Sequence, residues 1–429
     1  MRAEILAGGD LDAAAAAAVV RRLRSLIPAG ASVSASVAEI IAAVRDGGDR
    51  AVLDYTSRLD AGGSPIGSLV VDHGVVARAL DGLDGKVRAG LELAMDNVRA
   101  AALAGVVEDR LVSVDGASVS LREVPVDSAA VYAPSGRAPY PSSVVMGVIT
   151  ARAAGVGEIA VCAPPGRHGE IDSVILAACG LTGADRVYRM GGAHAIAALA
   201  YGSESVRAVD TIVGPGGLWV QEAKRQVSGV VAIDGFAGPS DLLVIADEGA
   251  QPEPIALDLL AQAEHGPGTL VLAASPSRLL LDGLAQRLAA GAETGAVAWL
   301  IEVGDMQSAL ELAQAFAPEH LQLIGPEAES LAREVTHAGC VFVGVAAGTA
   351  FGDYIAGSNH ILPTEGAARF SSALSVRSFR RTFTEVRVLD PGRLARAAAP
   401  VARAEGFELH ALSMEIRENR SSATDVEDA

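Results

Sequence analysis

The side chains with the clearest chemical potential lie in the tetrad Gln-Ala-Glu-His at 262–265, which closes a helical run just before Gly266-Pro267. Positions three apart share one face of a helix, so Gln262 and His265 can point at the same spot. Imidazole is a common zinc ligand, whereas an amide oxygen is a harder, weaker and neutral one. The tetrad therefore suggests part of a metal site. The alternative is a helix end at which His265 meets the helix dipole.

Carboxylates stand close to imidazoles at three further places. The pairs are Glu319 with His320 just before a predicted strand, Asp353 with His360 in one glycine-rich loop, and Glu405 with His410 in a C-terminal helical segment. Each pair offers two proton-transfer groups, because the ordinary pKa values of glutamate and histidine are about 4.3 and 6.5. A solvated loop pair without a catalytic role is the alternative for each.

Three glycine-rich turns follow predicted strands, at Gly191-Gly192, at 214–217 and at 237–240. The carboxyl ends of parallel strands are where α/β folds place their ligand crevice, and glycine lets the backbone approach a ligand closely. The sequence has neither a Gly-x-Gly-x-x-Gly motif nor a phosphate-binding lysine loop. The residues by themselves therefore give weak support for NAD, and plain strand–helix turns remain the alternative.

Length and charge exclude several classes of protein. The 429 residues allow two to four domains. A net charge of −18 makes a surface that repels nucleic acids and anionic membranes. Cys162, Cys179 and Cys340 lie in apolar stretches without metal-site spacing, so we interpret them as buried free thiols. Because no run is apolar enough to cross a bilayer and no signal peptide is evident, we expect a cytoplasmic protein.

Short apolar runs alternate with helical segments from about residue 128 onward. Strands are expected at 129–133, 159–163, 186–190, 211–213, 242–246, 270–273, 299–303, 321–324 and 341–345. Such unbroken runs indicate strands buried on both faces, so the predicted fold class is α/β, with two doubly wound parallel sheets in series. Before them the chain reads as mostly helical, at 11–26, 37–59 and 85–104. An amphipathic segment at 394–417 and a disordered tail at 420–429 are expected at the end.

Taken in order, the motifs resemble the histidinol dehydrogenase family over nearly the whole chain. They are Tyr-Ala-Pro-Ser-Gly at 132–136, Tyr-Pro-Ser-Ser at 140–143, Gly-Gly-Ala at 191–193, Glu-Ala-Lys-Arg at 222–225, Ala-Gly-Pro-Ser at 237–240, Gln-Ala-Glu-His-Gly-Pro at 262–267, Pro-Glu-His-Leu at 318–321, Gly-Asp-Tyr at 352–354 and Gly-Ser-Asn-His-Ile-Leu-Pro-Thr at 357–364. The resemblance implies oxidation of L-histidinol to L-histidine through the aldehyde, the last steps of histidine biosynthesis, with two NAD and one zinc ion per subunit.

The resemblance also implies roles for individual residues. Zinc would be bound by Gln262, His265, Asp353 and His410. His320 would be the general base, and Glu319 would activate water. Substrate contacts would fall on Ser142, Ser240, Gln262, His265, His320, Asp353, Tyr354, His360, Glu405 and His410. The positions next to the dinucleotide would be Tyr132, His194 and Gly217.

The family implies a homodimer in which Glu405 and His410 reach the active site of the other subunit. It also implies two incomplete Rossmann-like units, one inserted in the other, with helical extensions at both ends. The expected boundaries are 1–28 for an N-terminal helical segment, 29–131 with 241–372 for the first unit, 132–240 for the second, and 373–429 for a C-terminal helical arm.

Two positions depart from the family pattern, with His194 in place of the usual Gln and Gly217 in place of the usual Asn. Both usual residues contact the dinucleotide, so we expect weaker NAD binding or an altered nucleotide pose rather than lost catalysis. Three alternatives remain at this point. They are an NAD-dependent dehydrogenase of another small alcohol, a non-catalytic zinc-site homologue with impaired NAD binding, and a zinc hydrolase that uses Glu319 on a metal-bound water.

Overall fold

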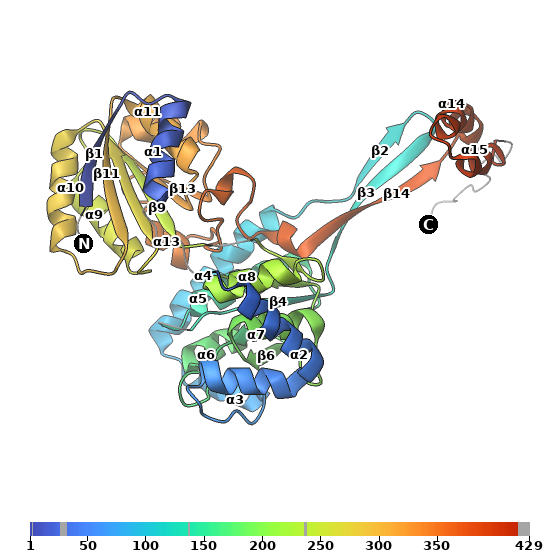
Figure 1. Cartoon of the computed structure of the whole chain (residues 1–429), viewed down its shortest axis with the longest axis horizontal. Helices are drawn as coiled ribbons and strands as arrows, with labels where there is room; N and C mark the ends of the chain where they lie inside the picture. The colour runs from blue at the N-terminus through green and yellow to red at the C-terminus, as the bar shows by residue number, and fades with distance from the viewer. Residues whose placement is uncertain (2, 26–31, 136–137, 236–237, 419–429) are drawn as a thin grey trace. The chain divides into compact units, whose positions relative to one another are not determined.

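The computed structural model describes residues 1, 3–25, 32–135, 138–235 and 238–418, and their contacts divide the chain into two compact units (Figure 1). The large unit comprises Met1–Gly105 and Val126–Phe379. The small unit comprises Val106–Pro125 and the chain from Arg380 onward. The tail at 420–429, expected to be disordered, lies outside the described residues.

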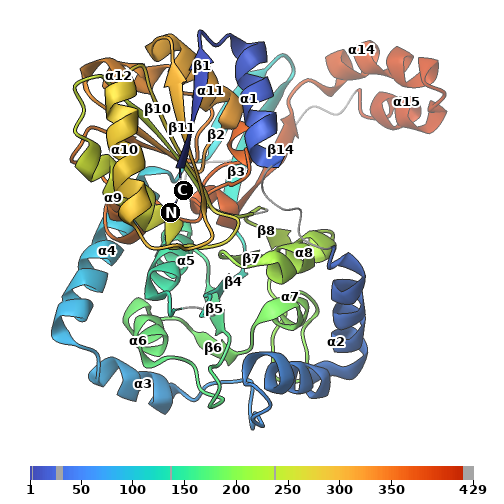
Figure 2. The ribbon, with the colours of Figure 1, turned by 60° about the vertical axis from the view of Figure 1, so that its left-hand side comes forward.

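The first sheet of the large unit has six parallel strands in the order β1-β11-β10-β9-β12-β13. Figure 2 labels β1, β11 and β10 of this sheet. The bounds of the six strands are β1 Ala3–Gly9, β9 Asp241–Ala246, β10 Leu270–Ser275, β11 Val297–Val303, β12 His320–Ile324 and β13 Cys340–Val343. One face packs against α1 (Ala13–Ser25), α11 (Met306–Phe316) and α12 (Pro326–Ser330), and the other against α9 (Pro252–Ala263) and α10 (Arg278–Ala290). Strands β9 and β10 are buried at every position, which explains their unbroken apolar sequence.

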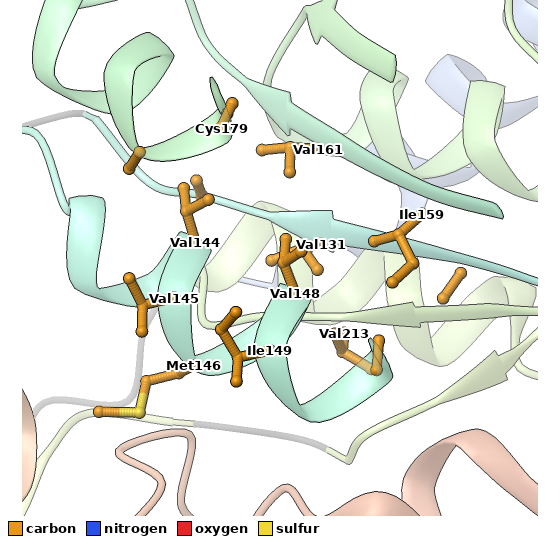
Figure 3. Close-up of a cluster of buried hydrophobic side chains, with 14 of the residues drawn as sticks. Val131, Val144, Val145, Met146, Val148, Ile149, Ile159, Val161, Cys179 and Val213 are labelled. Carbon is orange, nitrogen blue, oxygen red and sulfur yellow. The ribbon is translucent and has the colours of Figure 1, made fainter. Parts of the chain in front are cut away.

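The second sheet has five parallel strands in the order β6-β5-β4-β7-β8. Their bounds are β4 Ser128–Tyr132, β5 Glu158–Ala163, β6 Arg186–Arg189, β7 Thr211–Val213 and β8 Ala232–Ile233. One face packs against α5 (Pro141–Ala154) and α6 (Ser173–Thr182), backed by α3 (His73–Asp81) and α4 (Gly85–Ala104). Figure 3 shows this core, in which Val131 and Val161 of the strands meet Val144 and Val148 of α5. The other face packs against α2 (Ser34–Tyr55), α7 (Gly192–Tyr201) and α8 (Leu218–Val227).

Both sheets wind in the order of a dinucleotide-binding fold. In each, the chain runs outward from a first strand, β4 or β9, through two neighbours and then returns to add two strands on the other side. The order reverses between β4 and β7 in one sheet and between β9 and β12 in the other, with β1 added at an edge. The five-stranded sheet is inserted in the chain between β1 and β9 of the six-stranded sheet. The predicted α/β class is confirmed, and a strand forms at each of the nine expected places.

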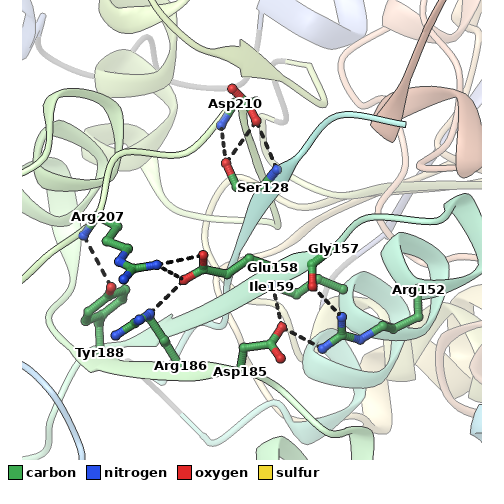
Figure 4. A network of polar contacts seen from close by, with 10 residues as sticks. All are labelled: Ser128, Arg152, Gly157, Glu158, Ile159, Asp185, Arg186, Tyr188, Arg207 and Asp210. Carbon is green, nitrogen blue, oxygen red and sulfur yellow. Dashed lines mark hydrogen bonds and ion pairs between the residues drawn. The ribbon is translucent and has the colours of Figure 1, made fainter. Parts of the chain in front are cut away.

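The amino edge of the five-stranded sheet is closed by a polar network (Figure 4). Glu158 pairs with Arg186 at 2.7 Å and with Arg207 at 3.0 Å, and Asp210 accepts hydrogen bonds from Ser128. These groups remain partly exposed to solvent, so each pair contributes little to stability. The network occupies the end of the sheet opposite the glycine turns.

The small unit consists of a three-stranded antiparallel sheet and two helices. The sheet order is β14-β3-β2, with β2 Arg110–Val114, β3 Ala117–Pro125 and β14 Arg380–Val388. Helices α14 (Pro391–Ala404) and α15 (Glu408–Glu415) replace the single amphipathic segment expected at 394–417, because Gly406 adopts φ +84° and separates them. The described buried side chains of this unit are small, whereas most of its large apolar side chains are exposed and none of those described is buried. The unit therefore has no apolar core of its own among the described residues.

Several expectations about the ends of the chain were wrong. Strand β1 lies in the segment 1–28 predicted as helical, β2 and β3 lie in the helical first part, and β14 lies in the arm at 373–429. The expected boundary at 131/132 cuts β4. Helices α2, α3 and α4 of the range 29–131 pack on the five-stranded sheet, not on the sheet built from 241–372. A sequence pattern shows that a helix has an apolar face but not which sheet covers it.

Five further short elements belong to the large unit. They are the π-helical turn η1 (Thr56–Asp60), the helix α13 (Thr349–Tyr354), and the 3₁₀ turns η2 (Leu331–Arg333), η3 (Ala367–Arg369) and η4 (Val376–Phe379). Over the described ranges, no helix is both long and apolar enough to cross a membrane.

Candidate active site

The carboxyl edge of the five-stranded sheet carries two glycine turns beside Tyr132. Gly192 donates its backbone N–H to the Tyr132 hydroxyl at 3.2 Å. Gly214 directly follows β7 with φ +116°, and a Cβ at this position would collide with the backbone carbonyl of Tyr132. Only glycine lets the two chain segments approach this closely. Burial raises the pKa of Tyr132, so the phenol stays protonated and can serve as donor and acceptor.

His194 lies under the first of these turns and is fully buried. Its Nε2 is 3.1 Å from Asp60, which also accepts the N–H of Gly191 at 2.9 Å. The ring stacks on Tyr55, with 5.8 Å between the ring centres. His194 therefore supports the Gly191-Gly192 turn through their shared contact with Asp60. Gly217, in contrast, is exposed at the start of α8, with nothing near its missing side chain.

The amino edge of the six-stranded sheet brings together Ser240, Glu319 and Gln262. Glu319 Oε2 accepts hydrogen bonds from the Ser240 hydroxyl and, at 3.0 Å, from the N–H of Asp241. The Gln262 side-chain nitrogen donates to the same hydroxyl. Ser240 thus links the amide to the carboxylate. This arrangement fixes the orientation of Glu319 and points the Gln262 oxygen away from Ser240.

His320 begins β12 and lies between two carboxylates. Its Nε2 is 3.3 Å from Asp353, and its Nδ1 is 3.6 Å from Glu319, which is close for an ion pair but long for a hydrogen bond. Burial lowers the pKa of His320, but the negative charges of Glu319 and Asp353 outweigh it and raise the pKa well above 6.5. The two carboxylates therefore favour a proton on this imidazole.

Asp353 lies close to three imidazoles of the site. Burial raises the pKa of Asp353, but the hydrogen bond and positive charge of His320, followed by His360 and His265, lower it overall. His360 Nδ1 contacts the Asp353 backbone carbonyl at 2.8 Å, and its Nε2 contacts Ser143 at 3.1 Å. Ser143 and its buried neighbour Ser142 lie in the first turn of α5, the helix that packs on the five-stranded sheet. The His360 contact therefore joins the two sheets.

The amino edge of the six-stranded sheet is held by two residues that the sequence did not single out. Asp241 accepts the N–H of Glu319 at 2.6 Å and the N–H of Glu365 at 3.3 Å. Arg24 donates to the carbonyls of Phe316 and Glu365. Ala317 and Glu365 are the two non-glycine residues with positive φ over the described ranges, at +48° and +54°. Both unfavourable conformations thus lie beside the Arg24 and Asp241 contacts.

Comparison with known proteins agrees with this geometry. The histidinol dehydrogenase family model matches residues 28–418. The chain is 42% identical to histidinol dehydrogenase of Parasynechococcus marenigrum, covering 88% of this chain and 89% of the relative. It is 41% identical to that of Pseudomonas aeruginosa, covering 90% and 91%. The crystal structure of histidinol dehydrogenase from Elizabethkingia anophelis superposes with a TM-score of 0.89 at 27% identity, covering 97% of this chain and 98% of that one.

The chain belongs to the histidinol dehydrogenase family. It is therefore an enzyme, an NAD-dependent oxidoreductase. The family uses NAD and zinc. Among the described residues no three His, Cys, Asp or Glu side chains are grouped as a metal site. The ligand set implied by the sequence includes Gln262 and divides across the two compact units.

The donor set of the large unit nevertheless suits zinc. The amide nitrogen of Gln262 donates to Ser240, which leaves the amide oxygen available as a metal ligand. His265 lies near enough to Asp353 to lower the pKa of that carboxyl. An amide oxygen, an imidazole and a carboxylate are all zinc ligands.

The structure brings together most of the predicted site residues. Ser142, Ser240, Gln262, His265, Glu319, His320, Asp353, Tyr354 and His360 belong to the large unit. Tyr354 is exposed beside Asp353, and partial loss of solvent contact together with the Asp353 charge raises its pKa. Glu405 and His410 belong to the small unit and are exposed there. Asp241, Arg24 and Asp60 were missed because they act on the backbone of the site, which leaves no motif.

Proposed function

We propose that this protein oxidises L-histidinol to L-histidine through L-histidinaldehyde, with two NAD and a zinc ion, as the last steps of histidine biosynthesis. The observation that carries the proposal is the buried Glu319–His320 pair, held by Ser240, Asp241 and Asp353 at the edge of the six-stranded sheet. Four-electron oxidation of an alcohol needs a base for two proton removals and a group that activates water. The pair offers one residue for each task.

His320 is the general base of the proposal. Hydride can leave the alcohol carbon only if the hydroxyl proton departs as well, since otherwise positive charge accumulates on the carbon. The carboxylates of Glu319 and Asp353 stabilise the imidazolium that forms when His320 takes up this proton. The same transfer serves the second oxidation, in which the substrate is the hydrated aldehyde.

Glu319 is the residue proposed to activate water for the hydrated aldehyde. Its Oε2 is engaged by Ser240 and Asp241, which orients the carboxylate. Because His320 is its neighbour, both half-reactions use one pair and the aldehyde need not leave. Bound aldehyde is thereby protected from side reactions.

The proposed zinc ligands are Gln262, His265 and Asp353 of one subunit and His410 of the other. When bound, zinc supplies a Lewis acid that orients the imidazole and amine of the substrate. The remaining proposed substrate contacts are Ser142, Ser240, Tyr354, His360 and Glu405, of which Glu405 matches the substrate ammonium by charge. Removal of the metal with a chelator should abolish turnover, and full activity of metal-free protein would overturn the ligand assignment.

The proposed dinucleotide site is the carboxyl edge of the five-stranded sheet. Its strand order reverses between β4 and β7, where such folds bind dinucleotides, and Tyr132 and Gly214 flank this point. Tyr132, His194 and Gly217 are the cofactor positions of the proposal. The exposed backbone of Gly217 is available to the nucleotide, whereas the buried His194 acts through Asp60 and the Gly191 turn.

The exposed apolar surface of the small unit supports the proposal of a homodimer with shared active sites. Most of its large apolar side chains are exposed, and Glu405 and His410 lie among the exposed Phe407, Leu409 and Leu412 in the sequence. An apolar surface of this kind is typical of an interface between chains. A second copy that buries this surface would also receive the two polar residues in its active site.

Mixed dimers test the sharing of sites. His320→Ala and His410→Ala should each be inactive as homodimers. A heterodimer purified through two different tags should recover about half of the wild-type activity, because one of its two sites combines an intact His320 with an intact His410. An inactive heterodimer would mean that each chain uses its own His410.

The reaction itself is tested by the NADH formed per L-histidinol consumed, with zinc-loaded protein and excess NAD. A ratio of two supports the substrate, the cofactor and both oxidations together. A ratio of one would remove the aldehyde oxidation from the proposal. No NADH with histidinol, but turnover with another small amino alcohol, would favour a related dehydrogenase.

A further inference from the structure

A buried ion pair holds the second glycine turn. Lys224 of α8 is 1% exposed, and its ammonium donates to the Gly214 carbonyl and to Asp234 Oδ1, both at 2.6 Å. The other oxygen of Asp234 accepts the Gly214 N–H at 2.7 Å. Both polar backbone groups of one residue are thus bound by the two members of one ion pair.

The contacts of Gly214 fix the position of this turn. It directly follows β7, packs against the backbone of Tyr132, and is followed through Pro215 and Gly216 by the exposed Gly217. Lys224 approaches from α8, and Asp234 from the segment that follows β8. The pair therefore ties β7, α8 and β8 together at the place where the strand order reverses.

The choice of lysine is informative in this chain. Of the 34 basic residues only two are lysines, Lys86 and Lys224, so arginine serves almost everywhere else. An ammonium is a compact charge that can reach two acceptors in a small space, whereas a guanidinium is planar and larger. Stability alone is a poor reason for such a pair, because desolvation of two buried charges offsets most of their attraction.

We propose that Lys224 and Asp234 are positioning residues for the cofactor, which set the Gly214–Gly217 turn so that its backbone meets the dinucleotide. This inference rests on the proposed NAD site at that edge. Neither side chain touches the reacting atoms. Loss of the pair should weaken cofactor binding and leave the histidinol side of the enzyme unchanged.

The test compares Lys224→Met with the matched control Lys86→Met, which changes the exposed lysine. NADH binding is measured directly by fluorescence, without turnover. KM for NAD and KM for histidinol are each measured with the other substrate saturating, and kcat with both saturating. Lys224→Met should raise the Kd for NADH and KM for NAD about tenfold, with KM for histidinol and kcat within twofold, because the turn loses its hydrogen-bonded support. Lys86→Met should match the wild type.

Lys224→Arg is the second variant, for the case in which Lys224→Met does not fold. It retains the charge but not the compact shape, and should raise the Kd for NADH several-fold in folded protein. A folded variant at position 224 with wild-type NADH affinity would overturn the proposal, and so would an equal loss of histidinol affinity. If wild-type protein did not bind NADH at all, the proposed function would fail instead.

Discussion

The two sheets of the large unit share one strand order but present different chemistry at their working edges. At the carboxyl edge of the five-stranded sheet, glycine turns expose backbone, while Asp60, Lys224 and Asp234 stay inside and hold that backbone. At the amino edge of the six-stranded sheet, Glu319 and His320 are themselves the chemical groups. A parallel sheet can thus supply a backbone cradle at one end or a side-chain cluster at the other. Substitutions should affect binding in the first case and chemistry in the second.

His320→Ala should give the largest effect. Loss of the base should lower kcat by about 10²- to 10⁴-fold for both oxidations, since general-base catalysis typically contributes that much. NADH affinity should be unchanged, because the dinucleotide edge belongs to the other sheet. Steady-state rates with histidinol and with the aldehyde measure this, and a normal rate with either substrate would remove His320 from that step.

Glu319→Gln should separate the two half-reactions. The amide retains the volume and can still accept a hydrogen bond, but it cannot take a proton from water, so aldehyde oxidation should slow by about 10²-fold and alcohol oxidation by much less. Single-turnover measurements with each substrate distinguish the two steps. Equal slowing of both would count against the water-activating role.

Asp241→Asn should change the pH dependence of stability. Burial, followed by the charge of Glu319, raises the pKa of Asp241 to about 7. Between about pH 4 and pH 7 the folded protein therefore keeps a proton that the unfolded chain releases, and stability falls as the pH rises through this window, by at most about 1.4 kcal/mol per pH unit. The variant lacks this carboxyl, so its free energy of unfolding relative to wild type should rise from pH 5 to pH 7. Urea unfolding at several pH values measures the difference, and parallel pH profiles would contradict it.

The smallest effect is expected at the two positions that depart from the family pattern. Gly217→Asn fits φ −70° at the start of α8, where asparagine also caps a helix well, and should lower KM for NAD several-fold. His194→Gln should not lower it, because the imidazole is buried against Asp60 and Tyr55. Initial rates over a range of NAD concentrations decide this. A lower KM in His194→Gln would place position 194 at the cofactor after all.

The sequence predicted the strands of the central sheets because burial on both faces leaves an unbroken apolar run, as in β9 and β10. It did not predict β1, whose partner β11 lies almost 300 residues away, or β2, which is exposed throughout. The Glu319–His320 pair was visible from its motif. Asp241 and Arg24 were not, since they recognise backbone groups that only the fold brings near.

The contrast between the two lysines has a practical consequence for handling the protein. Lys86 is exposed at the start of α4, capped by Asp84, while the ammonium of Lys224 is enclosed by Gly214 and Asp234. A reagent that modifies lysine side chains in folded protein should therefore react at Lys86, which is remote in sequence from every proposed site residue. Labelling or immobilisation through this one lysine then needs no introduced attachment residue. Labelling of Lys224 as well would report that the turn at Gly214 has opened.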